Sequence, residues 1–288
     1  MNKLSFSEPV WLASDIHLGP DNPRTCEAFY RFLAHAREYA GALILLGDIF
    51  NVWIGDDWTR RPPGWLSTAL DELRRTGLSI PMWILGGNRD FLIGSTLASY
   101  LNVRLIKDQC ILEMAAPEQA WSDEVAGTGG PSQSPAVKKY LLAHGDEFCT
   151  RDTRYQRFRK IVRNPVVQSC FMGLSLSIRE RIAQAARQSS MQTVRGPFDD
   201  RYDVEDSSIV SRLQALGAQT CIHGHTHKPG HQALAHGSTA LSSQDFNVFD
   251  RWVLPDWECD HTSGGQSRGG WMEIDVHGPR ILSLPDLP

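Results

Sequence analysis

The chain has 288 residues, of which 41% are hydrophobic and 22% are charged, as in an ordinary globular protein with a sizeable buried core. A chain of this length need not be more than one domain, so we expect a single domain over residues 1–288. Its formal net charge of −4 gives no reason to expect a nucleic-acid partner. The six cysteines form no C-x-x-C pair, which argues against a disulfide framework and a zinc finger. No signal-peptide stretch opens the sequence, and no apolar run approaches the ~18 residues of a membrane span. These features predict a cytoplasmic protein.

Five short apolar runs predict buried β-strands. They are residues 9–14, 42–46, 81–85, 140–143 and 220–222. Continuous apolar runs of this length are typical of strands that are buried on both faces. Helical spacing of apolar residues separates the first three runs, over residues 24–40 and 65–76. This alternation of strand and helix predicts an α/β fold.

Two segments are rich in glycine, serine and proline and are expected to be loops. The first, residues 115–137, reads as a long loop or the tip of a hairpin, and the second spans residues 258–270.

The segment 151–195 is the most basic part of the chain. Ten basic and two acidic residues give it a net charge of +8 and leave −12 for the remainder. Apolar residues recur in it at helical spacing, and Pro165 suits the first turn of a second helix. We therefore predict a helical insertion, over residues 151–212, between two strands of the main sheet. The alternative is a hairpin of helices with a solvated charged surface.

All five predicted strands run into a carboxylate, amide or imidazole side chain. These residues are Asp15 with His17, Asp48, Asn88, His144, and His223 with His225. Functional groups gather beyond the carboxyl ends of the strands in α/β sheets, so we expect these side chains to meet. Each motif alone is equally typical of a turn or a surface pair, and their combination points to a site.

The side chains in this set offer oxygen and nitrogen ligands and no thiolate, which favours Mn²⁺, Mg²⁺, iron or Zn²⁺ over a structural zinc. Seven ligands exceed the need of one ion and suit two ions that share a carboxylate. Paired ions about 3.5–4 Å apart can stabilise both oxygens of a phosphoryl displacement. Three histidines at alternate positions, His223, His225 and His227, would project to one side of an extended segment. The sequence thus indicates a two-metal site that attracts phosphate.

The motifs DIH, GD, GNRD, HGD and HGHTH resemble those of the calcineurin-like metallophosphoesterase superfamily. Within it, the stretches SDIHLG, GDIFNVWIGDD, GNRDFLIG, HGDEFCTRDTRYQRFR and IHGHTHKP are similar to those of bacterial UDP-2,3-diacylglucosamine hydrolases of lipid A biosynthesis. The resemblance covers about residues 11 to 230. It implies a metallophosphoesterase-type sandwich of two β-sheets flanked by helices, with residues 151–212 as a helical lid.

The resemblance also implies roles for individual residues. One ion would be held by Asp15, His17, Asp48 and His225. Asp48 would bridge to a second ion, held also by Asn88, His144 and His223. The implied catalytic residues are Asp48, Asn88, Arg89 and His223, and the implied substrate contacts are Asn88, Arg89, Asp152, Ser190 and His223. His227 is expected to lie behind the ligands.

The implied reaction is hydrolysis of the pyrophosphate of UDP-2,3-diacylglucosamine to UMP and 2,3-diacylglucosamine 1-phosphate, with two divalent ions, of which Mn²⁺ is favoured. Arginines beside large apolar residues in the basic segment suit a pyrophosphate with acyl chains and an anionic membrane surface, so we expect a peripheral protein of the inner membrane.

This sequence departs from the family at Val194 and Pro197, where relatives carry asparagine and lysine, so no role passes to these positions. The alternatives are another metallophosphoesterase for a dinucleotide or small phosphodiester, a nuclease, and a non-catalytic scaffold. All seven expected ligands are present, which argues against the scaffold.

Overall fold

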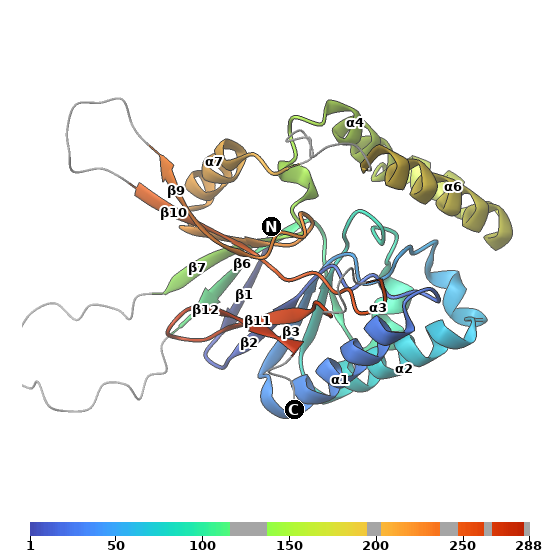
Figure 1. Cartoon of the computed structure of the whole chain (residues 1–288), viewed down its shortest axis with the longest axis horizontal. Helices are drawn as coiled ribbons and strands as arrows, with labels where there is room; N and C mark the ends of the chain where they lie inside the picture. The colour runs from blue at the N-terminus through green and yellow to red at the C-terminus, as the bar shows by residue number, and fades with distance from the viewer. Residues whose placement is uncertain (116–136, 195–202, 237–246, 262–266, 285–288) are drawn as a thin grey trace, which may run out of the picture.

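The computed structural model describes residues 1–115, 137–194, 203–236, 247–261 and 267–284. Its centre is a pair of six-stranded sheets packed face to face (Figure 1). The first sheet has the order β12 (Pro279–Ser283), β11 (Gly270–Ile274), β2 (Val10–Ala13), β3 (Ala42–Leu46), β4 (Met82–Leu85), β5 (Arg104–Ile106). The second has the order β1 (Asn2–Phe6), β6 (Gln109–Met114), β7 (Lys138–Ala143), β8 (Thr220–His223), β10 (Asn247–Val253), β9 (Gly230–His236).

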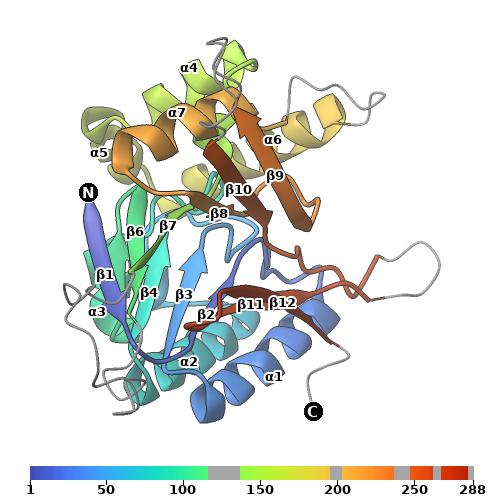
Figure 2. The ribbon, with the colours of Figure 1, turned by 90° about the vertical axis from the view of Figure 1, so that its left-hand side faces the viewer.

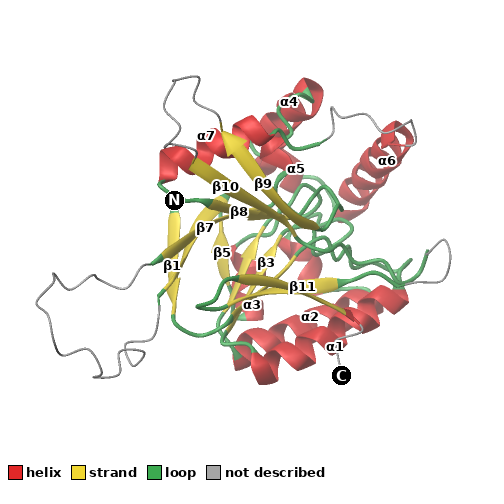
Figure 3. Ribbon diagram, turned by 60° about the vertical axis from the view of Figure 1, so that its left-hand side comes forward, coloured by secondary structure: helices red, strands yellow, loops and turns green. Residues whose placement is uncertain are grey.

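Helices cover the outer faces of both sheets. Three lie against the first sheet, namely α1 (Pro23–Tyr39), α2 (Gly64–Ser79) and α3 (Ser95–Leu101), and α7 (Asp206–Leu216) lies against the second. Figure 3 shows α1 and α2 on one side of the strands and α7 on the other. The architecture is therefore a sandwich of two sheets flanked by helices, which confirms the predicted fold class.

Strand β2 shows why the central strands are apolar throughout. Val10 and Leu12 lie in the core between the two sheets, whereas Trp11 and Ala13 pack against the α1–α2 layer. Successive side chains of a strand point to opposite faces, so a strand between two packed layers must be apolar at every position. The five strands and two helices predicted from apolar patterns are all present.

Several strands were not predicted, among them β6, β9, β10 and β11. β6 and β7 pair in antiparallel register and form the two arms of a hairpin. The segment between them, residues 115–137, was expected to be a loop or a hairpin tip. Residues 116–136 themselves lie outside the described part of the chain. In the second predicted loop, the backbones of Glu258 and Arg268 pair through two hydrogen bonds of 2.9 and 2.8 Å.

The basic segment forms three helices, α4 (Thr153–Val162), α5 (Pro165–Met172) and α6 (Leu176–Val194), which we call the helical segment. It lies beside the sandwich, as Figures 1 and 2 show. Pro165 is in the first turn of α5, as expected, and Asn164 caps that helix. The following helix, α7, buries Ile209, Val210 and Leu213 in a core shared with the second sheet. The limits 151–212 of the insertion remain a prediction.

Two further features concern the chain as a whole. None of the helices in the described ranges has the length and apolar character needed to cross a bilayer. The six cysteines form no disulfide; five are buried, and only Cys170, on α5, is exposed.

Candidate metal centre

The loops that follow β2, β3 and β7 bring three predicted ligands together. Asp15, Asp48 and His144 each offer a ligand atom within 4.8 Å of the others. His144 Nε2 lies 3.6 Å from Asp48 Oδ1. All three side chains are almost fully buried. Strands β2 and β3 are parallel neighbours in one sheet and β7 belongs to the other, so both sheets contribute to the cluster.

The backbone of the cluster is in an unusual conformation. Six non-glycine residues of the described chain have a positive φ, and five of them are Asp15, His17, Asp48, His225 and His227, with φ between 52° and 68°. This conformation costs roughly 1–3 kcal/mol per residue and persists only where the surroundings enforce it. Such residues concentrate at functional sites, so their gathering here marks this cluster as one.

Asn88 and Arg89 extend the cluster from the loop after β4. Asn88 Oδ1 lies 2.9 Å from His144 Nε2 and 3.0 Å from Nδ1 of His225. The backbone N–H of Arg89 donates to Asp48 Oδ1 at 2.9 Å, and its guanidinium Nε lies 3.4 Å from Asp48 Oδ2. Gly87 has to be a glycine because a Cβ there would collide with Asp48.

Asp90 joins the loops that follow β3 and β4. Its buried carboxylate accepts hydrogen bonds from the backbone N–H groups of Gly87 and Ile49, both at 2.7 Å, and of Asp48 at 3.2 Å. Burial and the nearby charge of Asp48 raise the pKa of Asp90 to about 6. The sequence analysis assigned no role to this residue, although the motif GNRD contains it.

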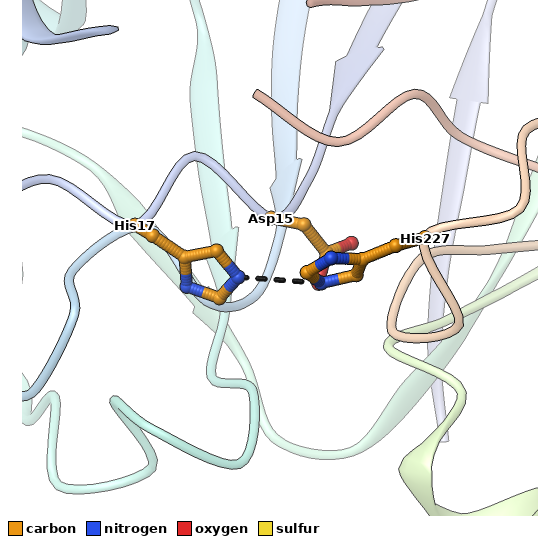
Figure 4. Close-up of side chains that lie close together, drawn as sticks. All are labelled: Asp15, His17 and His227. Carbon is orange, nitrogen blue, oxygen red and sulfur yellow. Dashed lines mark hydrogen bonds and ion pairs between the residues drawn. The ribbon is translucent and has the colours of Figure 1, made fainter. Parts of the chain in front are cut away.

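His227 lies beside Asp15 and His17 (Figure 4). Its Nε2 is 3.3 Å from His17 Nε2 and 3.4 Å from Asp15 Oδ1, and the three residues form a second group of close ligand atoms. The backbone N–H of His225 donates to Asp15 Oδ2 at 2.8 Å, and its ring lies against Asn88 and His144.

His223 is the last residue of strand β8. It is fully buried, its Nδ1 lies 2.8 Å from the carbonyl of Gly224, and its Nε2 accepts a hydrogen bond of 2.9 Å from Arg251. Both ring nitrogens therefore have protein partners. The same holds for His227, whose Nδ1 lies 3.5 Å from Asp256, so which of His223, His225 and His227 bind metal stays a prediction.

Burial and neighbouring charges shift the pKa values of three histidines of the cluster. Burial and the nearby positive charge of Arg251 lower the pKa of His223 to about 3. Burial and the nearby charge of His144 lower the pKa of His225 to about 4. Burial also lowers the pKa of His144, but Asp48, Asp15 and Asp146 outweigh it and raise the value to about 9.

Two buried polar atoms in the cluster have no hydrogen-bond partner in the described part of the chain, Asp15 Oδ1 and His17 Nδ1. Leaving such atoms unsatisfied is costly, and a cation bound between them removes that cost. The donor set is two carboxylates, an amide and imidazoles, which suits divalent metal ions. The residues therefore fit a metal centre.

The remaining predicted substrate contacts lie on the helical segment. Asp152 caps α4 by accepting a 2.9 Å hydrogen bond from the backbone of Tyr155. Ser190 and Val194 are in α6, but their side chains lie outside the described part of the structure, as does all of Pro197.

A hydrogen-bonded network that the sequence analysis missed joins α4 to the loops that carry Asn88 and His144. The fully buried Asp146 accepts from Tyr155 Oη at 2.5 Å and from Arg159 Nε at 2.8 Å. Arg163, at the end of α4, donates to the carbonyls of Gly86 and Gly87 at 3.3 and 3.1 Å. Tyr155, Arg159 and Arg163 recur every four residues on one helix face, a spacing that could have revealed the network.

Comparison with known proteins identifies the family of this chain. The model of the calcineurin-like phosphoesterase family matches residues 8–229. A protein of Bordetella parapertussis named UDP-2,3-diacylglucosamine hydrolase is 39% identical over 99% of this chain and 98% of its own length. Proteins of the same name from Chromobacterium violaceum (34%, covering 96% of this chain and 98% of the relative) and Pseudomonas fluorescens (33%, 96% and 95%) are also similar. The chain belongs to the calcineurin-like phosphoesterase family.

Proposed function

We propose that the protein hydrolyses the pyrophosphate of UDP-2,3-diacylglucosamine to UMP and 2,3-diacylglucosamine 1-phosphate, a reaction of lipid A biosynthesis. The names of relatives that match nearly the whole chain support this substrate. The observation that carries the chemistry is the buried cluster of Asp15, Asp48 and His144 with its unpartnered atoms at Asp15 and His17.

Two divalent ions, with Mn²⁺ the favoured metal, would occupy the cluster. One would be held by Asp15, His17, Asp48 and His225, and the other by Asp48, Asn88, His144 and His223. His227 would support this set from behind, where it contacts Asp15 and Asp256. Such ions activate water and neutralise charge on a phosphoryl group.

Arg89 and Asn88 would act on the phosphate. The Arg89 side chain is 34% exposed, and its Nε lies 3.4 Å from Asp48, so its guanidinium is next to the metals and still accessible. Its planar donors can stabilise charge that develops on the phosphoryl oxygens. The Asp90 carboxylate fixes the loop beneath both residues, which keeps these groups in place before the substrate arrives. Asp152 and Ser190 remain proposed substrate contacts.

The helical segment would receive the acyl chains and meet the inner membrane as a peripheral surface. Eight of its large apolar side chains are exposed: Phe158, Ile161, Val166, Val167, Met172, Leu174, Ile178 and Ile182. Burying one acyl methylene against such a surface contributes roughly 0.8 kcal/mol. Arg154, Arg157, Lys160 and Arg181 lie on the same helices and are available to anionic lipid or phosphate.

The decisive experiment is product identification by mass spectrometry with the purified chain, Mn²⁺ and UDP-2,3-diacylglucosamine. We expect UMP and 2,3-diacylglucosamine 1-phosphate in equal amounts. If neither forms while a dinucleotide or a small phosphodiester is hydrolysed, the protein is a different metallophosphoesterase. Repeating the assay with Mg²⁺ and Zn²⁺ tests the metal.

A further inference from the structure

Arg179, on α6, is a fully buried arginine at a place where the helical segment meets the sandwich. Its Nη1 donates to the carbonyl of Ile54 at 2.6 Å and to Asp57 Oδ1 at 2.9 Å, and its Nη2 bonds Asp57 Oδ2. Its Nε donates to the carbonyl of Leu174 at 3.1 Å. A buried guanidinium is tolerated only when its donors are satisfied. These contacts therefore fix the position of α6 against the sandwich of two sheets and its flanking helices, which we call the body.

The partner of Arg179 belongs to the Gly55-Asp56-Asp57 motif, in which the two carboxylates face different parts of the molecule. Asp56 accepts from Trp53 Nε1 at 3.1 Å and from the backbone N–H groups of Gly94 and Leu97 at 3.0 and 2.9 Å, all within the body. Asp57, the next residue, bonds Arg179 of the helical segment. Hydrogen bonding to Arg179 lowers the pKa of Asp57.

Gly55 makes this close approach possible. Its φ is +129°, and a Cβ at this position would lie 2.5 Å from both Arg179 Nη1 and Met172 Cε. A larger residue would displace the ends of these two side chains and would be strained at this positive φ. In this motif Asp56 contacts the body, Gly55 leaves space for the Arg179 side chain, and Asp57 binds its guanidinium.

The anchor lies close to the residues that would handle the phosphate. The backbone N–H of Trp53 donates to the carbonyl of Arg89 at 3.0 Å. One short segment, from Trp53 to Asp57, therefore contacts the Arg89 loop at one end and α6 at the other. Ile178 and Ile182, exposed on the same helix, are placed relative to the metal centre through this connection.

We infer that Arg179 is a positioning residue that, through Asp57 and the Ile54 carbonyl, holds the acyl-binding helices at a fixed place beside the metal centre and so sets the preference for acylated substrates. This inference rests on the proposed function. Arg179 touches neither the phosphate nor the metals. Its loss affects the acyl chains and leaves the chemistry at the phosphate in place.

The test compares Arg179→Ala, Asp57→Ala and the double variant on two substrates. For the diacylated substrate we expect KM to rise about tenfold or more in both single variants, because removing either partner of the Arg179–Asp57 pair frees α6 from this contact. The double variant should be no worse than the poorer single variant, since both remove one interaction. Hydrolysis of a small chromogenic phosphodiester should stay within about twofold. Arg179→Lys should recover part of the KM, because it keeps the charge and loses the planar fork.

Glu180→Ala is the matched control, since Glu180 is the next residue on α6 and is exposed. It should leave both substrates unchanged. Equal losses on both substrates in Arg179→Ala, or an unchanged KM for the diacylated substrate, would overturn the inference.

A second measurement separates this inference from the proposed function. Amide hydrogen exchange without substrate should show faster exchange in α6 for Arg179→Ala and Asp57→Ala, with α1 and α2 unchanged. If the wild-type protein does not hydrolyse the diacylated substrate, the proposed function fails, and exchange in α6 alone decides whether Arg179 anchors the helix. Unchanged exchange there would rule the anchor out.

Discussion

The metal centre and the helical segment present opposite kinds of surface. In the metal centre the side chains of Asp15, Asp48 and His144 are at most 2% exposed and are held by loops from both sheets. The helical segment exposes eight large apolar side chains, up to 69% at Val166. A site that performs chemistry needs fixed geometry, whereas a surface that receives flexible chains needs apolar area. The two regions should therefore respond to mutation in different ways.

The largest effect is expected from Asp48→Ala, which removes the carboxylate shared by both proposed ions. Hydrolysis of every substrate should fall about a thousandfold or more, with bound metal reduced in elemental analysis. Circular dichroism serves as the control for folding. Near-normal turnover at saturating Mn²⁺ would show that the cluster is not the catalytic centre.

His223→Ala and His227→Ala test the proposed division between ligand and supporting histidine. Because His223 is proposed to hold an ion, its removal should cost about one bound ion and about a thousandfold in rate. His227 is proposed to lie behind the ligands, between Asp15 and Asp256, so its removal should reduce the rate by between about 10-fold and 100-fold and leave most of the metal bound. Elemental analysis of both proteins decides the matter. Equal loss of metal in the two variants would contradict the assignment.

Arg163→Ala probes the border between the two regions, since Arg163 lies on α4 and bonds the carbonyls of Gly86 and Gly87. We expect a loss of between about 10-fold and 100-fold on both substrates, as for other residues that orient metal ligands. Asp108→Ala is the control, because Asp108 is half exposed and pairs with Arg163 at 3.1 Å and with Arg159 at 3.8 Å, away from the glycine carbonyls. A loss confined to the acylated substrate would assign Arg163 to the helical segment alone.

The smallest effect is expected from Phe158→Asp on α4. A charge on the apolar surface should weaken use of the diacylated substrate about tenfold, with a much smaller change for a small phosphodiester. Leu78→Asp likewise replaces an apolar side chain by a carboxylate, at an exposed position near the end of α2 and outside the helical segment, and should affect neither. Steady-state kinetics with both substrates makes the comparison. Similar losses in the two variants would point to general destabilisation.

The central strands and most of the metal centre could be predicted because local sequence determines both. An apolar run that ends in Asp48 or His144 defines a strand and places its polar residue at the strand's end. Strands β9 to β12 could not be predicted in this way, since their sequences mix polar and apolar residues. β11 in addition joins the first sheet by pairing with β2, which is far away in the chain.

The assignment of the histidines could not be settled by spacing. Three alternate residues share a side only in extended backbone. Strand β8 ends at His223, and His225 and His227 both have positive φ, so the chain turns between them and the rings separate. The arginines of the basic segment were similarly ambiguous, because composition counts Arg159, Arg163 and Arg179 as surface charge, whereas the fold turns them inward.

Of the six cysteines, only Cys170 offers an exposed thiol for labelling. Burial raises the pKa of all five buried cysteines, to about 12 for Cys110 and Cys149, which suppresses the thiolate that reacts with alkylating reagents. Cys170 is exposed on α5, within the helical segment. A maleimide fluorophore would thus attach to the natural sequence at one known point, and its emission would follow events at these helices.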